Sequence, residues 1–589
     1  MNDVDKKLEL IECNTLSGES ALAIRYNRYL YRLTSLYNCS AQIDRWFTNY
    51  ENCNPYSIFV MFGVANGIYL DKMLEYYDNA IFLIYEPLNE IYEKIENKYK
   101  DNKNVYITYG NNGKTDIYYL FNIFFSTSSY KYVKWIVLPN YDYLWEKDIL
   151  DVYRQYAYIL NTVVMDARTK AVYDKSAGID YLKILSDLFN QYSEYDLENK
   201  MALFINKESV AIVVAAGPSL ERNIEELKLV KNHAFIIAVD TALKPLYASG
   251  VKPDIVVSID NGKPISFFDT PDFANMPFVL ESGGNPRLVK IHKGKRFYAT
   301  SGESYTSELL DLIGKKSGHI LTGGSVGNSA FYLAVACGFK KIIMVGHDLA
   351  MTNGKIHAEG IHENKKDNIA SENGTYRDVD GYYGGKVRTR GDYYAYLRWF
   401  ELQIECHPEL EVINSTEGGA NIRGARNESL KKAIEEWCLE LPYINYNSII
   451  NKVDKLCSED DKDIIQEYLE SLPEKMKKYK KKLKEGINEY NNLKKLKYEE
   501  KEGTEEFKNS FAKIKELNSW LSKIKENSLL DMYEADFQNS LDIGIYDFKD
   551  DTDEEWDSTI NLGINSFKLY LKRIDDFLKD YKIIKGERK

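Results

Sequence analysis

The stretch AIVVAAGPSL, residues 211–220, joins a run of apolar residues to a Gly-Pro-Ser sequence, and the helix-like segment ERNIEELKLVKN (221–232) follows it. A glycine and a proline at the tip of a buried strand are typical of a tight strand-to-helix turn. Such a turn can also bind phosphate, because main-chain N–H groups and the positive end of the helix converge there. The stretch therefore predicts either a structural turn or a phosphate site, and the rest of the chain has to distinguish them.

The same apolar pattern recurs across a central domain, residues 176–450, with helical segments or turns between the runs. Strands that alternate with helices predict an α/β fold with a Rossmann-like, doubly wound and mostly parallel sheet. Sheets of this kind bind ligands beyond the carboxyl ends of their strands. The predicted strands are AIVVAA (211–216), AFIIAVD (234–240), DIVVSID (254–260), PFVLES (277–282), RFYATS (296–301), KIIMVG (341–346) and EVINST (411–416).

Small and polar residues stand where several of these strands end, and a glycine-rich loop opens the apolar helix of LTGGSVGNSAFYLAVACG (321–338). Its glycines let a ligand approach the main chain, and an anion suits the helix N-terminus. Any one of these features is more often a turn or a helix cap, but together they converge on one edge of one sheet. The candidate binding residues are Gly217, Pro218, Ser219, Asp240, Thr241, Asp260, Gly323, Gly324, Ser325, Val326, Gly327 and Asn328.

Residues 1–175 predict an N-terminal α/β domain with a strand–helix–strand pattern. Gly63 and Gly67 lie in its first turn, and Glu86 ends the second strand at a distance along the chain that suits a ribose hydroxyl. The glycine spacing is not that of a dinucleotide fingerprint, so a purely structural lobe is the alternative. The predicted strands are SIFVMFG (57–63), AIFLIYEP (80–87) and NVYITYG (104–110).

Residues 451–589 predict a C-terminal helical domain. Apolar residues recur every three or four positions over 465–490 and again over 507–524, with a loop expected at 501–506. Such stripes usually face a core, so we expect packed helices that close the fold, with partner binding as the alternative.

Composition narrows the class of protein. The net charge of -12 argues against a general nucleic-acid binder. The seven cysteines show no Cys-x-x-Cys spacing, which favours free thiols in a reducing compartment. The N-terminus has no apolar signal region, and the longest apolar stretch is too short to span a bilayer. We therefore expect a cytoplasmic protein with no membrane span, no covalent cofactor and no metal-ligand motif.

Four stretches carry a resemblance to a known family: IVVAAGPSL, ALKPLYASGVKPDIVVSID, GGSVGNSAFYLAVACGFKKIIMVGHDLA and INSTEGGANIRG. They resemble the motility-associated factor (Maf) proteins, bacterial flagellin glycosyltransferases whose central domain is similar to sialyltransferases that use CMP-sialic acid. The motifs cover roughly residues 180–430.

The resemblance implies transfer of a nonulosonic acid, such as pseudaminic, legionaminic or a sialic-like sugar, from its CMP donor to Ser or Thr of flagellin. Such a reaction would serve flagellum assembly and motility. The resemblance places Gly217-Pro218-Ser219 beside the nucleotide. It matches Ser325-Val326-Gly327 to a loop that contacts the carboxylate of the donor sugar, and Asp348 to a family aspartate.

The sequence departs from the sialyltransferase pattern in two respects. Ala216, Asp240 and Asp260 stand where those enzymes have asparagines, and carboxylates beside a phosphate repel it unless a cation or a hydroxyl lies between them. A divalent metal requirement is therefore left open. The family's catalytic histidine is also absent from the corresponding stretch GYYGGKVRTRGDYY (381–394).

A general base is therefore sought elsewhere. The candidates are His357 and His362 in GKIHAEGIHEN (354–364), followed by Asp348 and Glu359. A polar loop after a strand is a plausible lid that carries titratable groups, although such loops also hold incidental polar residues. Lys386, Arg388 and Arg390 are candidate clamps for a phosphate or carboxylate, or else solvent-facing charges.

Two other functions fit parts of the sequence. The Gly-Pro-Ser-Leu and aspartate pattern also resembles an archaeal pterin pyrophosphokinase family, for which Asp240 and Asp260 would hold Mg²⁺. A pyrophosphokinase would account for the aspartates at the strand ends. It would not account for about 300 flanking residues, which suit a large protein acceptor. A non-catalytic flagellin-binding chaperone is the third possibility.

Overall fold

The chain forms two compact units, Met1–Arg168 and Thr169–Lys589. Within the described part of the chain, no helix is both long enough and apolar enough to cross a bilayer. The computed structural model describes residues 8–16, 18–77, 79–126, 129–230, 232–300, 305–351, 376–525, 528–531, 533 and 553–587.

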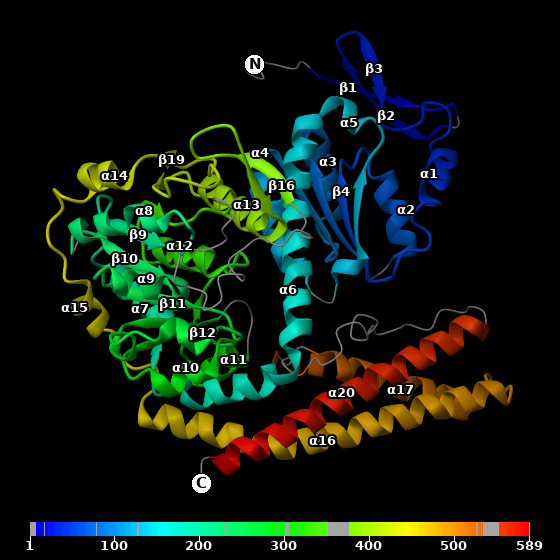
Figure 1. The fold of residues 1–589 in the computed structure, drawn as a ribbon. Coiled ribbons are helices and arrows are strands. Elements are labelled where there is room, and N and C mark those ends of the chain that lie inside the picture. Colours follow the sequence, from blue (N-terminus) through cyan, green and yellow to red (C-terminus); the bar gives the residue numbers. More distant parts are fainter. Residues whose placement is uncertain are drawn as a thin grey trace. The chain divides into compact units, whose positions relative to one another are not determined.

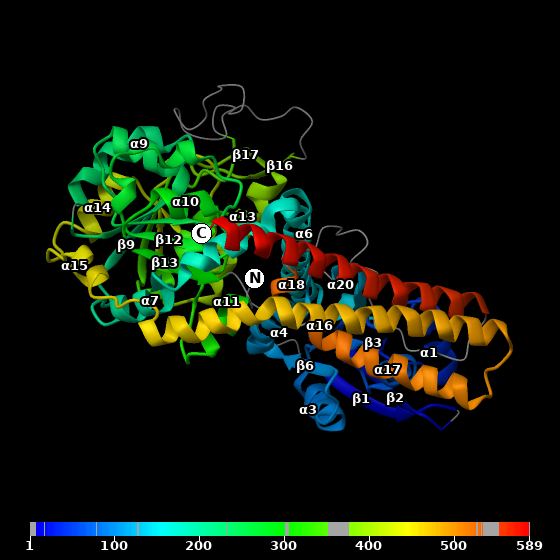
Figure 2. The same cartoon turned by 90° about the horizontal axis from the view of Figure 1, so that it is seen from below.

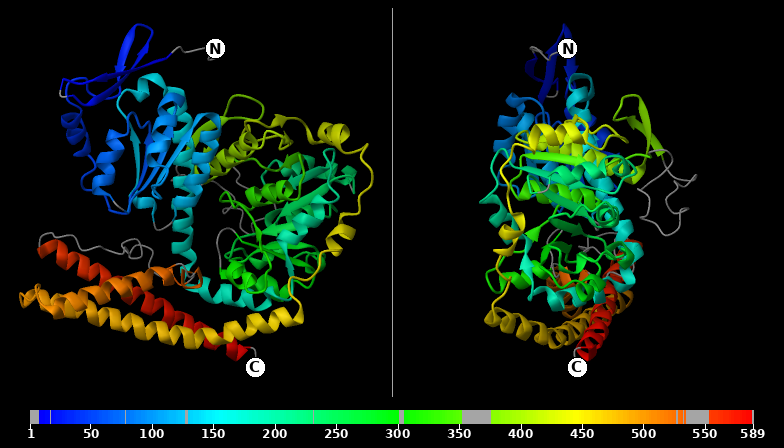
Figure 3. Two further views of the ribbon diagram at one scale, coloured as in Figure 1. Left: turned by 180° about the vertical axis from the view of Figure 1, so that it is seen from behind. Right: turned by 60° about the vertical axis from the view of Figure 1, so that its left-hand side comes forward.

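The first unit contains a four-stranded parallel sheet in the order β6-β5-β4-β7, seen from behind in the left panel of Figure 3. Burial on both faces requires apolar strands, and every residue of β4 is buried. The three predicted strands are confirmed. Strand β7 was not predicted, because Lys134 interrupts its apolar run. The elements are β4 (Ile58–Phe62), α2 (Ile68–Tyr76), β5 (Ile81–Glu86), α3 (Asn89–Tyr99), β6 (Val105–Tyr109), α4 (Gly110–Phe124), β7 (Val133–Val137) and α5 (Tyr141–Leu144).

An antiparallel sheet precedes the parallel one and was not predicted from the sequence. Its strands are short, and β1 alternates between exposed and half-buried positions, so its apolar signal is weak. The elements of this part are β1 (Glu9–Asn14), β2 (Ser20–Tyr26), β3 (Tyr29–Arg32) and α1 (Cys39–Phe47).

Glu86 is fully buried at the end of β5 and braces the first turn of the parallel sheet. Its Oε2 accepts hydrogen bonds from the main-chain N–H of Val64 (2.9 Å) and the hydroxyl of Tyr141 (2.8 Å), and its Oε1 accepts one from the N–H of Leu88 (3.0 Å). Both oxygens are therefore used inside the protein, so the expected contact with a ribose does not fit this geometry. Burial raises the pKa of Glu86 to about 7, although these three donors favour the carboxylate.

We expect Glu86→Gln to destabilise the first unit by about 1–3 kcal/mol at pH 4.5. The NH₂ group of glutamine cannot accept a hydrogen bond, so at least one of the three groups that donate to Glu86 loses its acceptor. A raised pKa means that the folded state holds its proton longer than the unfolded state. The stability contributed by Glu86 is therefore complete below its ordinary value of 4.5 and is lost as the pH rises through about 7. The difference in free energy of unfolding between variant and wild type should therefore become smaller between pH 4.5 and 7. Amide hydrogen exchange of β4 and β5 measures it. Glu90→Gln is the control, because Glu90 is exposed. A difference in free energy of unfolding between Glu86→Gln and wild type that does not change with pH would contradict this account.

The second unit is built on a ten-stranded sheet with the main order β14-β13-β12-β11-β10-β9-β15-β18-β19, in which all pairs are parallel (Figure 1). The doubly wound fold class is thereby confirmed, and so are all seven predicted strands. The sequence did not give their order, in which β10 and β15 flank β9 on opposite sides. The strands are β8 (Tyr192–Ser193), β9 (Val210–Val214), β10 (Phe235–Val239), β11 (Ile255–Ser258), β12 (Phe278–Glu281), β13 (Arg296–Thr300), β14 (Gly318–His319), β15 (Lys341–Val345), β18 (Glu411–Asn414) and β19 (Arg426–Asn427).

Helices flank this sheet, and an antiparallel hairpin, β16–β17, lies outside it. The hairpin was not predicted from the sequence, because its strands are polar and charged. These elements are α6 (Glu146–Leu188), which runs from the first unit into the second, α7 (Glu194–Ala202), α8 (Leu220–Asn223), α9 (Leu243–Ala248), α10 (Pro286–Ile291), α11 (Tyr305–Asp311), α12 (Val326–Ala336), β16 (Tyr376–Asp380), β17 (Lys386–Arg390), α13 (Gly391–Cys406), α14 (Leu430–Trp437) and α15 (Tyr446–Asn451).

The C-terminal region consists of the long helices α16 (Glu459–Tyr498), α17 (Glu505–Lys525) and α20 (Asp553–Glu587), with the short α18 (Ser528–Asp531) (Figure 2). The predicted stripes and the loop between them are confirmed, and α20 is an addition. A capping box at Ser458 and Asp461 begins α16. Buried residues of these helices share one hydrophobic cluster with β12 and β13, as expected for helices that close a fold. The division at residue 450 into a separate domain stays a prediction.

Candidate functional site

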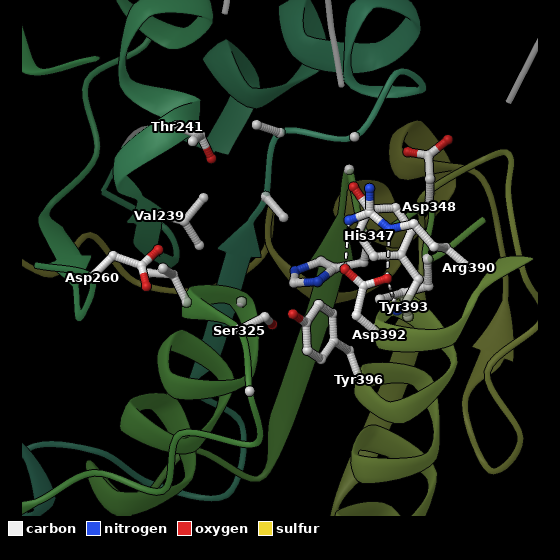
Figure 4. A pocket seen from close by; sticks show the side chains of 18 of the residues that line it. Val239, Thr241, Asp260, Ser325, His347, Asp348, Arg390, Asp392, Tyr393 and Tyr396 are labelled. Carbon is white, nitrogen blue, oxygen red and sulfur yellow. Dashed lines mark hydrogen bonds and ion pairs between the residues drawn. The ribbon is translucent and has the colours of Figure 1, made fainter. Parts of the chain in front are cut away.

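A cavity of about 240 Å³ lies beyond the carboxyl ends of β9, β10 and β15, where the strand order reverses (Figure 4). This is the position at which doubly wound sheets bind ligands, because adjacent loops diverge there. Its lining residues are Ala215, Ala216, Gly217, Val239, Thr241, Asp260, Lys263, Gly324, Ser325, Val326, Gly327, Gly346, His347, Asp348, Leu349, Arg390, Asp392, Tyr393 and Tyr396.

The Gly-Pro-Ser turn is held in place by the end of β15. The N–H of Gly217 donates to the carbonyl of Gly346 (2.8 Å). The hydroxyl and N–H of Ser219 both donate to Oδ2 of Asp348, at 2.6 and 3.2 Å. A Cβ at position 217 would overlap that carboxylate and lie 2.5 Å from the Gly346 oxygen. Glycine is therefore required here so that the turn can approach β15 closely, while Ser219 is fully buried behind the cavity.

The glycine-rich loop presents the first turn of α12 to the cavity. Ser325 is the N-cap: its Oγ accepts from the N–H of Asn328 (3.2 Å) and donates to Oδ1 of Asn328 (2.7 Å). Asn328 is buried and also donates to the carbonyl of Tyr396 (3.3 Å), which ties this turn to α13. Gly323 packs against Trp399 rather than the cavity. The main-chain N–H groups of a first helical turn favour an anion at Ser325–Gly327.

The two carboxylates at the ends of β10 and β11 are joined by a lysine. Lys263 Nζ lies 3.6 Å from Asp240 and 3.2 Å from Asp260. Asp240 is fully buried and accepts from the hydroxyl of Ser258 (2.8 Å) and the N–H of Thr241 (2.7 Å). Burial raises the pKa of Asp240, while Lys263 opposes that rise. Burial disfavours the charged form of Lys263, but the two carboxylates outweigh it and raise its pKa. The lysine thus offsets the negative charge of the acidic strand ends.

His347 contributes a neutral imidazole to the cavity. It is 3% exposed, and its Nε2 lies 3.3 Å from the carbonyl oxygen of Val213. A carbonyl only accepts, so Nε2 carries the proton and Nδ1 is an unprotonated acceptor. The ring packs edge-on against Phe400. Burial lowers the pKa of His347 to about 4, although the bond to Val213 favours the charged form.

The opposite end of the cavity is formed by the start of α13. Arg390, the N-cap of this helix, donates to Asp392 from Nε (2.6 Å) and from a terminal nitrogen (2.5 Å), and it stacks on the ring of Tyr393. These hydrogen bonds are the main reason that the pKa of Arg390 is raised. In Figure 4, Thr241 and Asp260 lie at one end and the Arg390–Asp392 pair at the other. The N-terminal turns of two helices, α12 and α13, therefore line one cavity.

Eight of the sixteen predicted site residues line this cavity. Pro218, Ser219, Asp240, Gly323 and Asn328 are not part of the lining. His357, His362 and Glu359 lie outside the described residues, and their role as a base stays a prediction. Of the candidate clamps, Arg390 lines the cavity, while Lys386 pairs with Asp380 and Arg388 stacks on Tyr376. The predicted residues that line the cavity are Gly217, Thr241, Asp260, Gly324, Ser325, Val326, Gly327 and Asp348.

Sequence reasoning missed Lys263, Asp392, Tyr393 and Tyr396, and it gave His347 no role. Lys263 stands three residues after Asp260, which is a weak signal in hindsight, since a lysine in a polar loop is usually solvated. His347 lies inside the GHD sequence that ends β15, and only packing shows that its ring turns into the cavity.

Comparisons with known sequences match parts of the second unit. Residues 184–354 match the family described as 6-hydroxymethylpterin diphosphokinase MptE-like. A 6-hydroxymethyl-7,8-dihydropterin pyrophosphokinase of Methanothermobacter thermautotrophicus is 27% identical over 144 residues, which are 23% of this chain and 56% of that protein. An uncharacterized protein of Treponema pallidum is 41% identical over 56 residues, 10% of this chain and 27% of that protein. The chain thus matches only part of the length of each curated relative.

A solved structure resembles the whole chain. A Maf glycosyltransferase from Magnetospirillum magneticum AMB-1 aligns over 98% of this chain and 91% of its own, with a TM-score of 0.50 and 13% identity. The resemblance to Maf proteins that the sequence motifs indicated is therefore confirmed for the fold.

Proposed function

We propose that this chain is a glycosyltransferase that moves a nonulosonic acid from its CMP donor to serine or threonine hydroxyls of flagellin. The observation that carries the proposal is the pair of helix N-termini, α12 and α13, that line one cavity at the switch point of the sheet, beside Arg390 and Lys263. Such a site suits a ligand with two anionic groups. A CMP-nonulosonate has a phosphate and a carboxylate. The likeness to a Maf glycosyltransferase along nearly the whole chain supports the same conclusion.

The proposed transfer reaction makes three demands on the site. CMP is a good leaving group, so the protein has to hold the phosphate, fix the sugar carboxylate and stabilise positive charge that develops at the anomeric carbon. We assign the phosphate or carboxylate to the first turn of α12, and the second anion to the region of Arg390. All seven cysteines are free, which fits a reaction in a reducing compartment such as the cytoplasm.

Ser325→Ala is expected to lower transfer to flagellin at least tenfold while the protein stays folded. Loss of an N-cap hydroxyl costs about 1 kcal/mol of stability, but it also releases the first turn of α12 from Asn328 at the proposed donor site. The measurement is the intact mass of flagellin co-expressed with the protein and a CMP-nonulosonate supply. Mass added in steps of one nine-carbon sugar, and lost in the variant, is the expected result.

The matched control for this experiment is Ser429→Ala, which removes another N-cap serine, that of α14, outside the cavity lining. It should cost similar stability and leave the added mass unchanged. If wild-type protein adds no mass when donor is confirmed present, the proposal is wrong.

A pterin-type pyrophosphokinase is the second candidate, favoured by the sequence matches over residues 184–354. That reaction would use ATP with Mg²⁺ held by Asp240 and Asp260. Lys263 already bridges these carboxylates, so a metal ion between them would require its displacement. Formation of AMP from ATP and a hydroxymethylpterin, with flagellin mass unchanged, would favour this function over glycosyl transfer.

A further inference from the structure

We propose that His347 is the general base that takes the proton from the acceptor hydroxyl, an assignment that rests on the glycosyltransferase function proposed above. The argument compares the titratable groups that line the cavity within the described part of the chain, and asks which of them has an acceptor atom available. Those groups are Asp260, Lys263, His347, Asp348, Arg390, Asp392, Tyr393 and Tyr396.

The carboxylates are largely engaged by other groups. Oδ2 of Asp348 receives both the hydroxyl and the N–H of Ser219, and this contact holds the Gly-Pro-Ser turn. Asp392 is bound through both oxygens by Arg390. Asp260 is paired with Lys263. A carboxylate oxygen that already accepts such hydrogen bonds has fewer lone pairs available for the proton of an acceptor hydroxyl.

The imidazole of His347 is arranged in the opposite way. The carbonyl of Val213 fixes the proton on Nε2 and thereby leaves Nδ1 without a proton, as an acceptor. That atom faces the first turn of α12: a Cβ placed on Gly327 would lie 3.3 Å from Nδ1 and 3.1 Å from Cε1. Glycine at 327 therefore keeps space open in front of the imidazole. In Figure 4 the His347 ring lies between Ser325 and Asp392.

Placement beside the α12 turn puts Nδ1 next to the atoms that react. If that turn holds the donor's anionic group, an acceptor hydroxyl that approaches the anomeric carbon comes within reach of His347. The hydroxyl proton moves to Nδ1, and the hydroxyl oxygen forms a bond to the anomeric carbon. The bond from that carbon to the phosphate oxygen breaks, and its electron pair leaves with CMP. Protonation at Nδ1 leaves Nε2–H bound to Val213, so the imidazolium keeps one hydrogen bond.

The low pKa of His347 keeps its imidazole in the neutral form at neutral pH. The elements packed on the ring present neutral groups: the Val213 carbonyl, Gly327 and Phe400. The hydroxyl of Thr416 accepts from the main-chain N–H of His347 (3.2 Å). The charged groups that share the cavity are Asp348 and the pairs Lys263–Asp260 and Arg390–Asp392. A pKa of about 4 keeps the imidazole unprotonated from pH 5 to 8. Once the hydroxyl oxygen bonds to the anomeric carbon it becomes strongly acidic, so a base with a pKa of about 4 still accepts its proton.

The test compares His347→Gln with wild type in single-turnover transfer to flagellin from a CMP-linked nine-carbon sugar. Glutamine can still donate to Val213 and accept near Nδ1, but it cannot take a proton. The rate should fall about 10²–10⁴-fold, while the Kd for CMP stays within threefold of wild type. His292→Gln is the matched control: His292 is also buried with Nε2 on a carbonyl, that of Met276 (2.7 Å), and its pKa is also lowered to about 4, but it lies outside the cavity lining. Its rate should be unchanged.

The pH profile supplies an independent check. With His347 as base, the wild-type rate should stay level from pH 8 down to pH 5, whereas a histidine with the ordinary pKa of 6.5 would give a fall below that pH. A fall centred near 6.5 overturns the assignment whatever the variants show. His347→Asn is a second variant, in case His347→Gln does not fold. Transfer is measured with whichever of the two variants binds CMP with the Kd of the wild type. A retained rate above one third of wild type also overturns it.

The two proposals fail in different ways. If the wild-type protein transfers no sugar, the glycosyltransferase function falls and the base assignment falls with it. If the wild type is active and His347→Gln is equally active, only the base assignment is wrong.

Discussion

Gly217→Val should lower the rate of transfer to flagellin at least a hundredfold without unfolding the protein. The reason is the close approach of the Gly-Pro-Ser turn to β15. A Cβ at this position overlaps the carboxylate of Asp348 and the carbonyl of Gly346, and a main-chain oxygen cannot move away as a flexible side chain can. The turn has to retreat, which breaks the hydrogen bond from Gly217 to Gly346 and reshapes the cavity wall. Misplacement by about 1 Å can cost a hundredfold in rate.

The measurement for this variant is the intact mass of flagellin, together with the midpoint of thermal unfolding. Gly503→Val is the matched control, because a Cβ at Gly503 meets open space. It should leave both quantities unchanged. Full activity in Gly217→Val would mean that the site lies elsewhere on the sheet.

Lys263→Met should weaken donor binding at least tenfold and destabilise the second unit by about 3–5 kcal/mol, the usual cost of leaving a buried charge without its partner. Asp240 is fully buried, and Lys263 is the positive group beside it. Burial already raises the pKa of Asp240 above its ordinary value of 3.8, and removal of the lysine raises it further. The loss of stability in Lys263→Met should therefore be absent below pH 3.8, where the carboxyl of Asp240 is protonated in both the folded and the unfolded state. It should grow as the pH rises toward 7.

Urea unfolding between pH 3 and 7 and titration with CMP measure these effects. Lys252→Met is the matched control: Lys252 and Asp272 form an exposed ion pair at 3.8 Å, which should contribute less than about 1 kcal/mol. Adding Asp240→Asn to Lys263→Met should restore part of the stability but not the affinity, because only the buried charge is relieved. Equal stability of Lys263→Met and wild type at pH 7 would show that the lysine does not compensate Asp240.

Much of the second unit was determined by the sequence itself. All seven predicted strands are present, because a strand buried on both faces has to be apolar along its whole length, and that signal is local. The same holds for α16 and α17, whose apolar stripes follow the helical period. The sequence also placed Gly217 and Ser325 at the edge of the sheet where the cavity lies, since the carboxyl ends of parallel strands share one edge.

Only the tertiary structure decided how the cavity is assembled. Ser219 and Asp348 are 129 residues apart in the chain, and their contact depends on β15 lying beside β9. Strand order is set by the packing of the whole sheet, so no local pattern reveals that the order reverses at this pair. The same packing separates Asp240, which is buried against Lys263, from Asp260, which faces the cavity, although both follow a strand. It also fixes the proton of His347 on Nε2, through a carbonyl on a neighbouring strand.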